Sequence, residues 1–515
     1  MERQNKKGYR LMAVCLLSAV SVTACAHEGA MNTNAASGKN KNDISVISDV
    51  PADESGLFSK RDLSGEFDAM KCDSILLSDA GCTTDSANVT IDGSKVTITG
   101  EGDYMVSGVL SDGMIIVDVD KKEKVQLVLN GADINCETSA AVYVKSADKV
   151  FITLPDGTEN TLTNGGSFAA LDDNHIDAVI FSKDDLTLNG TGRLTINSPA
   201  GHGIVSKNDL VIADGTYDIT ASSHGMAGKD SVAAASGVFR IKAGKDAIKS
   251  DNDGDDTKGT IYILGGNYTL TGESDGMNAL NEINISGGNI VVERSCEGLE
   301  ARIINISGGT VDITSSDDGI NATDKRPSAK EQSTETQDAG SKKGRGGGKN
   351  ENEPEASINI SGGVLRVDAE GDGLDSNGYI TINGGEVYVT GPSHGGDAAL
   401  DYGIDAVING GIVVAAGQGT MAQNFGADST QGSILINTQE QNEAGSDIIL
   451  LGADGSEILV WTMKKRYDSV TISCPEIKAG ESYTVKMGGS TVDVAMDGLI
   501  YGQGFSFGGG KHGFR

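Results

Sequence analysis

Apolar and polar residues alternate along short runs that recur through the second half of the chain. Four runs open on glycine and carry apolar residues at every second position, at 288–292, 309–313, 363–367 and 385–389. A period of two residues predicts β-strands. Each strand is followed by an acid-glycine turn, and the turn glycines Gly276, Gly298 and Gly319 are 22 and 21 residues apart. A fixed period of this length indicates a solenoid.

The solenoid that fits these strands is a parallel β-helix. A leucine-rich repeat would carry a Leu-x-x-Leu-x-Leu pattern, whereas each coil here carries short alternating strands bounded by Gly-Gly. We therefore predict an all-β protein, a parallel β-helix of about ten coils of ~22 residues. Each side chain would lie above its counterpart one coil away, at roughly 4.8 Å. After about residue 419 the period stops, and five further strands predict a small C-terminal β-sandwich-like cap.

The segments outside the repeat divide the chain further. An apolar run from Leu11 to Val22 is too short to span a membrane and is typical of a secretory signal, and Val22-Thr23-Ala24-Cys25 is similar to a bacterial lipobox. Cys25 would then be the lipid-modified first residue; the alternative is an ordinary signal peptide in which Cys25 is incidental. The predicted parts are a lipoprotein signal peptide (1–24), a disordered tether (25–62), irregular N-terminal coils and cap (63–185), the regular β-helix (186–420) with a disordered insertion (325–355), the C-terminal β cap (421–501) and a disordered tail (502–515).

The composition narrows the possible partners. The chain has 71 Gly, 4% aromatic residues and a formal net charge of −32. Such an acidic surface argues against nucleic acid and anionic lipid as partners, so the membrane would be met through the N-terminal lipid alone. We expect an exported, membrane-anchored monomer at the cell surface, which could hold an acidic ligand only through cations.

Acidic residues recur in register at the turns. A single Asp-Gly turn carries no functional information, because Asp bonds its own backbone and Gly accepts a positive φ. Two carboxylates about 5 Å apart, however, repel by roughly 3 kcal/mol at an effective dielectric of 20. One predicted column holds Asp275, Glu297, Asp318 and Asp372, and a second, three residues later in each coil, holds Asn278, Glu300, Asn321, Asp375 and Asp401.

These columns need a neutralising partner. No Lys or Arg is predicted at the stacked positions, and clustered carboxylate and amide oxygens on turns, without Cys or His, favour Ca²⁺ over Zn²⁺. We therefore predict a Ca²⁺ protein, with Asp246 and Asp251 extending the sites one coil earlier. The alternative is a set of solvated acids with shifted pKa values.

Histidines and lysines repeat at the same spacing in the coils that precede the acids. His202 and His224 are 22 residues apart, as are Lys207 and Lys229, and Lys249 follows in the next coil. Two interpretations remain open. The residues form a surface ladder, or they form a basic patch that contacts an acidic ligand.

Together these residues resemble a clostridial family of cell-surface carbohydrate-binding β-helix proteins, formerly a domain of unknown function. The resemblance rests on Gly201–Leu210, Gly228–Asp230, Asp246–Asp251 and the serial acid-glycine turns, and covers about residues 85 to 500. It implies a right-handed parallel β-helix with bound Ca²⁺ that binds acidic plant polysaccharide such as polygalacturonate, and cellulose. The chain departs from the family pattern at Ala247 and Ala399 in place of Gly, at Glu297 and Glu300 in place of Asp, and in the loop inserted after Asp324.

The sequence thus predicts a surface-anchored, calcium-dependent protein that binds polygalacturonate or pectin and has no catalytic residues. The first alternative is a pectate lyase or polygalacturonase on the same fold, because Gly201-His202-Gly203 and Arg240-Ile241-Lys242 echo two polygalacturonase motifs. A hydrolase needs two carboxylates at a defined separation, and a repeated ladder singles out no such pair. The second alternative is a structural adhesin whose Ca²⁺ only stiffens the fold.

Overall fold

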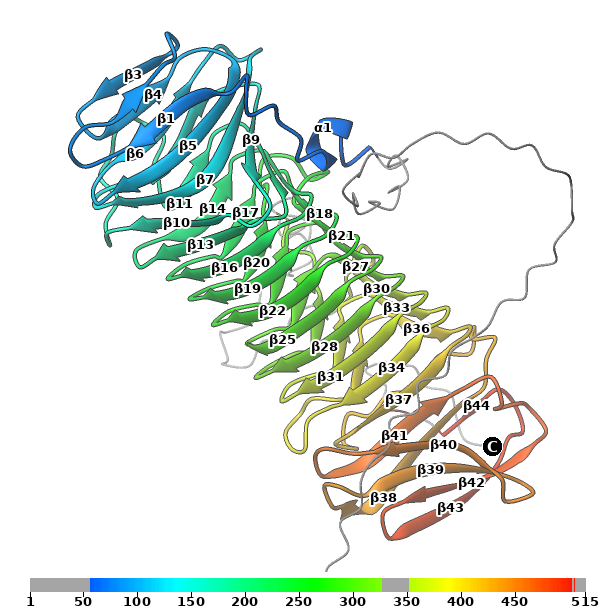
Figure 1. The fold of residues 1–515 in the computed structure, drawn as a ribbon. Helices are drawn as coiled ribbons and strands as arrows, with labels where there is room; N and C mark the ends of the chain where they lie inside the picture. Colours follow the sequence, from blue (N-terminus) through cyan, green and yellow to red (C-terminus); the bar gives the residue numbers. More distant parts are fainter. Residues whose placement is uncertain (1–55, 327–351, 503, 505–515) are drawn as a thin grey trace, which may run out of the picture. The chain divides into compact units, whose positions relative to one another are not determined.

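The computed structural model describes residues 56–326, 352–502 and 504 (Figure 1), which belong to one compact unit. The predicted signal peptide, Cys25 and most of the tether lie outside these residues, as do most of the insertion and most of the tail. No helix in the described part of the chain is long and apolar enough to cross a membrane. Its one helix, α1 (Lys60–Leu63), is a single turn, and the regular structure is otherwise β-strand.

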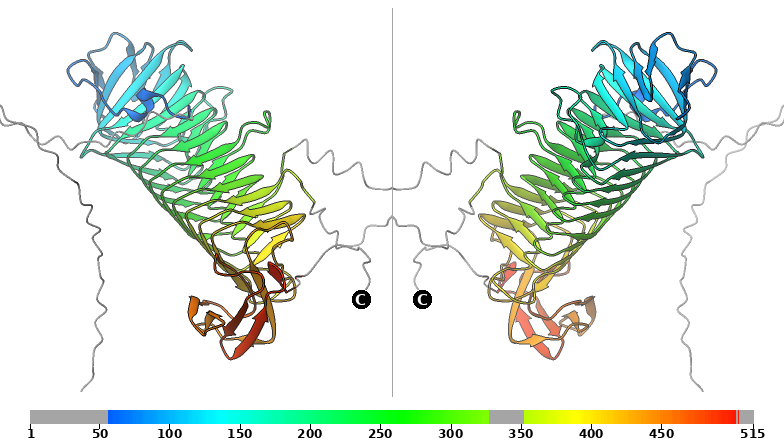
Figure 2. Two further views of the ribbon diagram at one scale, coloured as in Figure 1. Left: turned by 90° about the vertical axis from the view of Figure 1, so that its right-hand side faces the viewer. Right: turned by 90° about the vertical axis from the view of Figure 1, so that its left-hand side faces the viewer.

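The strands form three parallel ladders, because each strand pairs with the strand three positions further along the chain. β12 pairs with β15, β13 with β16 and β14 with β17, all in parallel. Each repeat therefore supplies one strand to every ladder, and successive repeats stack on one another (Figures 1 and 2). The prediction of an all-β protein with long parallel sheets is confirmed.

Ten strands of each ladder follow one another at this period within the described residues. The first ladder holds β9 (Lys149–Leu154), β12 (Asp185–Gly190), β15 (Asp209–Ile212), β18 (Ser231–Ala234), β21 (Thr260–Ile263), β24 (Glu282–Ile285), β27 (Ile303–Ile306), β30 (Ser357–Ile360), β33 (Tyr379–Ile382) and β36 (Asp405–Ile408). The second holds β10 (Glu159–Asn164), β13 (Arg193–Ser198), β16 (Thr216–Ala221), β19 (Val238–Ala243), β22 (Asn267–Gly272), β25 (Asn289–Ser295), β28 (Thr310–Ser315), β31 (Val364–Ala369), β34 (Glu386–Thr390) and β37 (Ile412–Gly417). The third holds β8 (Val142–Ser146), β11 (Ala178–Ser182), β14 (His202–Ser206), β17 (Met226–Gly228), β20 (Ile248–Ser250), β23 (Met277–Ala279), β26 (Leu299–Ala301), β29 (Ile320–Ala322), β32 (Leu374–Ser376) and β35 (Leu400–Tyr402).

The N-terminal strands are less regular but continue the parallel pairing. β5 pairs with β7, and β4 pairs with β6, in parallel, while β3 and β4 form an antiparallel hairpin. The bounds are β1 (Asp73–Leu77), β2 (Thr83–Thr84), β3 (Val89–Asp92), β4 (Lys95–Ile98), β5 (Gly102–Leu110), β6 (Met114–Asp118) and β7 (Lys124–Cys136). The tether prediction is wrong for its last residues, because Ser59 caps α1, and the buried Asp62 lies 2.6 Å from Lys149 Nζ.

The C-terminal strands end the parallel stack with antiparallel pairing. β41 pairs antiparallel with β37, so it covers a strand edge that would otherwise be open to other chains. β39, β40, β42 and β43 form a separate four-stranded antiparallel sheet. The bounds are β38 (Ser433–Asn442), β39 (Asp447–Gly452), β40 (Glu457–Thr462), β41 (Tyr467–Ser473), β42 (Ser482–Met487), β43 (Ser490–Ala495) and β44 (Ile500–Tyr501). The five predicted strands are present; β43 and β44 were not predicted.

The core follows from the alternation within each strand. One large buried cluster takes side chains from all three ladders, including Leu188, Ile196 and Ile204. Because successive residues of a strand point to opposite faces, the positions between these apolar residues point away from the core. The outward positions therefore form rows that cross the stacked strands, and polar and charged side chains occupy several of these rows.

Glycine has two different roles in the repeat. The second glycine of each Gly-Gly pair has a positive φ, +91° at Gly288 and +81° at Gly309, which favours glycine. The glycine after each column acid does not, so the predicted reason for its presence is wrong. A Cβ on Gly319 would lie 2.2 Å from Val367 Cγ1 and 2.5 Å from the carbonyl oxygen of Gly373. The close approach of the next coil, and not the turn, requires glycine there.

Substitution of Gly319 tests this explanation. We expect Gly319→Ala to destabilise the protein by about 1–3 kcal/mol, the usual cost of overpacking, because its new methyl group meets backbone and a core side chain. Gly396→Ala is the matched control, since nothing lies within 4 Å of its Cβ position. Thermal unfolding followed by circular dichroism compares the two variants. Equal melting temperatures would show that the close approach does not select glycine.

Candidate functional site

The backbone register places the first set of acids in one row. The N–H after each row member donates to the carbonyl oxygen of the member one coil further on, at 2.8–3.1 Å. The row lies in the turn before each strand of the third ladder, and we call it the turn row. Its members are His202, His224, Asp246, Asp275, Glu297, Asp318 and Asp372.

The second set of acids forms a row on the third ladder itself, which we call the strand row. The strand register pairs each member with the next across β20, β23, β26, β29, β32 and β35. Its members are Lys249, Asn278, Glu300, Asn321, Asp375 and Asp401. The two rows thus run next to each other, three residues apart in every coil.

Carboxylates of the two rows converge in two groups. Asp275, Glu297 and Glu300 form the first, and Asp318, Asp372 and Asp375 form the second; within each, one oxygen of every side chain lies within 4.8 Å of the others. One hollow of about 290 Å³ is lined by the whole second group and by Glu297 and Glu300 of the first. Seven carboxylates and one ammonium group line it: Glu297, Glu300, Asp317, Asp318, Asp372, Asp375, Asp401 and Lys325.

The crowding of these acids shows in their pKa values. Burial, followed by the charges of Glu300 and Asp275, raises the pKa of Glu297 to about 9. Burial also raises the pKa of Asp372 to about 9, against a hydrogen bond from the backbone of Ala398, and that of Asp318 to about 6. Without a cation, Glu297 and Asp372 would hold protons at neutral pH that ordinary carboxylates have lost.

Two lysines neutralise part of the rows, which corrects the prediction that no basic residue is stacked there. Lys325 forms an ion pair with Glu300 of the first group. Lys249 Nζ lies 3.4 Å from Asp246 Oδ2 and 3.6 Å from Asp251 Oδ2. Asp246 and Asp251 are therefore placed around a lysine and not in either carboxylate group. The second group is the better candidate for a metal ion.

The donor atoms of the hollow fit Ca²⁺. Glu297 Oε2 and Asn321 Oδ1 are buried and have no hydrogen-bond partner among the described residues. Asp318 Oδ1 accepts from the N–H of Asp372 at 2.8 Å, which fixes the side chain and leaves its second oxygen for another partner. Carboxylate and amide oxygens without Cys or His are the ligand set of Ca²⁺. Asp318, Asp372, Asp375 and Asn321 could hold such an ion.

The histidines belong to the turn row and have structural partners. Their rings stack with centroids 4.9 Å apart. His202 Nδ1 accepts from the N–H of His224 at 3.1 Å, and His224 Nδ1 accepts from the N–H of Asp246 at 3.2 Å. Burial lowers the pKa of His224 even though Asp246 lies beside it. These contacts favour the surface ladder over a ligand-binding patch.

Two of the predicted lysines, Lys207 and Lys229, lie in another row, at the end of the third-ladder strands, whereas Lys249 belongs to the strand row. Lys207 Nζ lies 5.1 Å from the centroid of the Phe181 ring, a cation–π contact, and Lys229 is exposed. Lys183 precedes them in the same row, since its N–H donates to Val144 as that of Lys207 donates to Ser182. The sequence analysis missed Lys183 because its coil precedes the regular spacing.

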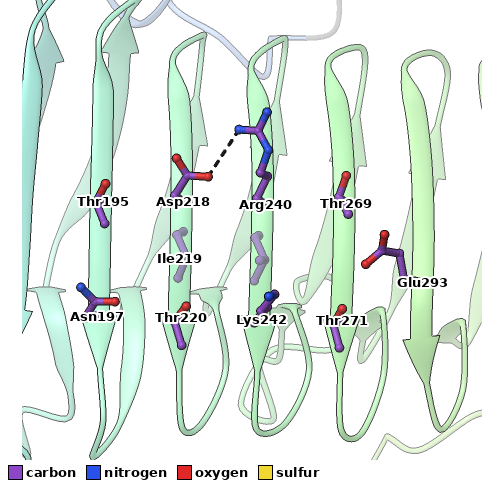
Figure 3. Close-up of a pocket in the computed structure, with 11 residues that line it drawn as sticks. Thr195, Asn197, Asp218, Ile219, Thr220, Arg240, Lys242, Thr269, Thr271 and Glu293 are labelled. Carbon is purple, nitrogen blue, oxygen red and sulfur yellow. Dashed lines mark hydrogen bonds and ion pairs between the residues drawn. The ribbon is translucent and has the colours of Figure 1, made fainter.

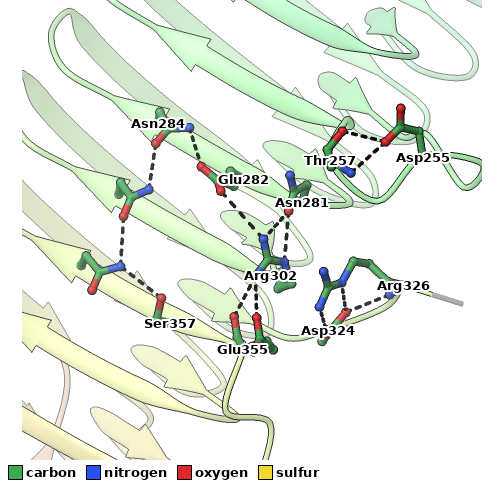
Figure 4. A network of polar contacts seen from close by, with 12 residues as sticks. Asp255, Thr257, Asn281, Glu282, Asn284, Arg302, Asp324, Arg326, Glu355 and Ser357 are labelled. Atoms are coloured by element: carbon green, nitrogen blue, oxygen red, sulfur yellow. Dashed lines mark hydrogen bonds and ion pairs between the residues drawn. The ribbon is translucent and has the colours of Figure 1, made fainter. Parts of the chain in front are cut away.

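Both ends of the predicted insertion are held against the coils (Figure 4). Arg302 is buried, with its Nε 3.1 Å from Asn281 Oδ1 and its Nη1 3.6 Å from Glu355 Oε2. Arg326 Nη2 lies 2.7 Å from Asp324 Oδ2. The prediction of a disordered insertion over 325–355 is therefore wrong at both ends, and the ordered N-terminal end carries Lys325 into the acidic hollow.

Comparisons with known proteins address the class of ligand. The family described as "Carbohydrate-binding domain-containing protein" matches residues 92–330, 297–398 and 353–514. A curated relative of that description from Acetivibrio thermocellus is 43% identical over 129 residues, which are 25% of this chain and 45% of that protein. The match thus spans less than half of that relative's length.

A solved structure is also similar to part of the chain. It is described as the polysaccharide lyase-like protein from C. thermocellum, as a gadolinium derivative, and is 33% identical with a TM-score of 0.43. The similarity covers 45% of this chain and 93% of that one. Because the family match extends over most of the sequence, the protein belongs to the family of carbohydrate-binding domain-containing proteins.

Proposed function

We propose that this protein is a non-catalytic, exported protein that binds acidic polysaccharide of the polygalacturonate type in a calcium-dependent manner. Membership of the family supplies the carbohydrate class. The observation that carries the finer proposal is the hollow in which seven carboxylates converge with two unpartnered buried oxygens. A polyanion would be repelled by this hollow unless a cation stood between them.

Ca²⁺ would supply that cation at the second group. The protein offers Asp318, Asp372, Asp375 and Asn321 there, whereas Ca²⁺ takes about 6–8 oxygen ligands. Sugar carboxylates could complete the ligand set. The turn row and the strand row hold the protein's oxygens in place, because each side chain is fixed by the register of two neighbouring strands. Neutral glucans lack the carboxylates and should bind weakly.

We also propose that the three ladders close into a right-handed parallel β-helix. The core cluster takes side chains from all three ladders, and the strands of the ladders alternate in a constant order along the chain. Both features support ladders that close around one core as a parallel β-helix. Parallel strands joined by crossovers are right-handed in nearly all proteins, which supports the right-handed form.

Export and anchoring complete the proposal. The apolar run from Leu11 and the lipobox-like sequence ending at Cys25 support a lipid anchor on the outer side of a membrane. A chain with a net charge of −32 would not adhere to anionic lipid by itself. We propose that the protein acts there as a monomer, with the lipid as its contact to the membrane.

The rival function is pectin cleavage. The carboxylates of the hollow form a repeating series in which no pair stands apart as acid and base. Lys249 of β20, which lies beside Asp246 of the turn row, is held by Asp246, Asp251 and Asn278. These contacts support binding over catalysis.

Binding with and without a chelator tests the proposed function. We expect immobilised polygalacturonate to retain the protein in Ca²⁺, and excess EDTA to weaken retention about tenfold or more, because the ion stands between two sets of carboxylates. Fully methyl-esterified pectin is the matched control, since esterification removes the sugar carboxylates. The same incubations should release neither unsaturated ends nor reducing sugars. Retention unchanged by EDTA, or turnover lost in Lys249→Ala, would contradict the proposal.

A further inference from the structure

The outward face of the second ladder carries a second hollow, of about 300 Å³ (Figure 3). Two rows of polar side chains cross β13, β16, β19 and β22 at this point. One row is Thr195, Asp218, Arg240 and Thr269, and the other is Asn197, Thr220, Lys242 and Thr271. Seven carboxylates and one ammonium group line the acidic hollow, whereas this one offers two cations and four threonine hydroxyl groups beside two acids.

A bulge interrupts the second row at β25, whereas the first row continues in register to the apolar Val291. The register between β22 and β25 shifts after Leu270, so that Thr271 pairs with Arg294, and the pairing of β25 with β28 is irregular at the same place. The additional residue, Glu293, lines the hollow at its end (Figure 3). Because bulges redirect side chains and interrupt a regular surface, the hollow is a local feature of these coils and not a general property of the repeat.

The charges that line the hollow balance, with two cations and two acids, in a protein that is otherwise strongly acidic. Asp218 is shared by Arg193 and Arg240, the latter at 3.4 Å from Nη1 to Oδ1. Lys242 is exposed and forms no ion pair within the described residues. Because Asp218 is already paired with two arginines, Lys242 is available to an anionic ligand.

The hydroxyl groups lie on a rigid support. Threonine has a restricted χ1 angle, and the strands beneath are paired on both sides, so little side-chain freedom is lost on binding. Each hydroxyl can donate and accept, as sugar hydroxyls do. A linear sugar chain laid across the strands would meet a new pair of side chains at every coil, at a spacing of roughly 4.8 Å.

The two hollows are lined by residues that are close in the chain, on either side of the end of β25. Glu293 lines the hollow on the second ladder, and Glu297, four residues later in the chain, lines the acidic hollow.

We infer that the face across β13, β16, β19 and β22 is a second subsite for a carboxylated polysaccharide, at which Arg240 and Lys242 pair directly with sugar carboxylates. Thr195, Thr269, Thr271 and Asn197 bind the sugar hydroxyls. This inference rests on the proposed function and adds a site that uses no metal. Direct pairing of exposed charges is screened by salt and is insensitive to chelators. Two linked contacts on one polymer bind more tightly than either alone.

The test compares Arg240→Gln/Lys242→Gln with Lys478→Gln/Lys486→Gln, which removes the same charge from exposed positions of the C-terminal strands. Binding of polygalacturonate is measured in Ca²⁺ and in EDTA, each at low and high NaCl, with circular dichroism as the check on folding. We expect the first variant to bind about tenfold more weakly in both Ca²⁺ and EDTA, with a flatter NaCl dependence, and the second to match the wild type.

Thr271→Val provides an independent variant, because it removes a hydroxyl group without changing charge or shape. It should weaken binding and leave the NaCl dependence unchanged. If the wild type binds and EDTA weakens it, while Arg240→Gln/Lys242→Gln keeps wild-type affinity, this inference is overturned and the proposed function stands. If the wild type binds polygalacturonate under no condition, both are overturned.

Discussion

Replacement of Asp318 and Asp372 together by asparagine is expected to weaken the binding of polygalacturonate about 30-fold or more, equivalent to about 2 kcal/mol. The two carboxylates belong to the second group, and both face the acidic hollow. Their removal leaves Ca²⁺ with too little negative charge to be held. The variant should therefore bind in Ca²⁺ only as well as the wild type binds in EDTA, and EDTA should weaken it no further.

Asparagine is chosen because it preserves the contacts that hold the row together. Asp318 Oδ1 accepts from the N–H of Asp372, and Asp372 Oδ1 accepts from that of Ala398; an amide oxygen can accept both bonds. Asp428→Asn/Asp497→Asn changes the net charge equally at exposed positions. If the hollow variant kept wild-type affinity with an unchanged circular dichroism spectrum, the acids would be structural and the polysaccharide would bind elsewhere.

The chelated protein is expected to lose stability as the pH rises from 5 to 9, and Ca²⁺ is expected to restore it. Burial raises the pKa of Asp372 to about 9 and that of Asp318 to about 6, whereas an unfolded Asp titrates near 3.9. Between these values the folded protein holds protons that the unfolded chain has released. Stability is therefore fully present below about pH 4 and is lost as the pH rises through the folded pKa values.

Ca²⁺ acts in the opposite direction, because it binds the deprotonated carboxylates of the folded state. One ion at about 100 times its dissociation constant contributes about 2.7 kcal/mol. The rise in melting temperature caused by Ca²⁺ should thus be larger at pH 8 than at pH 5. Asp246 does not titrate between pH 5 and 9. Against the effect of burial, His224 and Lys249 lower its pKa to about 2.

Melting temperatures at pH 5 and pH 8, each in EDTA and in Ca²⁺, measure this prediction. Asp318→Asn/Asp372→Asn is the control, because it removes two of the titrating groups and should reduce the pH dependence of the chelated protein, to which Glu297 still contributes. A chelated wild type that melts at the same temperature at both pH values would show that the buried acids are compensated by something other than protons.

Repetition explains how much of the site could be predicted. The fixed period places equivalent residues of successive coils on the same strand position, so residues 22 apart in sequence, such as Asn278 and Glu300, are paired in register. The parallel ladders and the two acid rows could be predicted in this way, whereas the C-terminal strands were predicted from alternation alone. The same logic failed for Asp251, which follows the last residue of β20 and turns to Lys249.

The features that the sequence did not predict depend on contacts that do not recur from one coil to the next. Lys325 reaches Glu300 because both ends of the insertion pack against the coils, and the path of an insertion is not encoded by the repeat. Glycine at position 319 is required by a methyl group and a carbonyl oxygen of the next coil, which a turn motif cannot reveal. The bulge at Glu293 breaks the register that the sequence analysis assumed to be uniform.

The sequence by itself thus determined the strands, their parallel stacking and the alignment of the acids, because alternation and a constant period act locally and repeat in every coil. Tertiary structure alone decided which acids share a hollow, which are neutralised by lysine, and where cations and hydroxyl groups form a separate face. Those outcomes depend on side chains brought together from an insertion, a bulge and neighbouring ladders. The distances between them are set by packing and not by spacing in the chain.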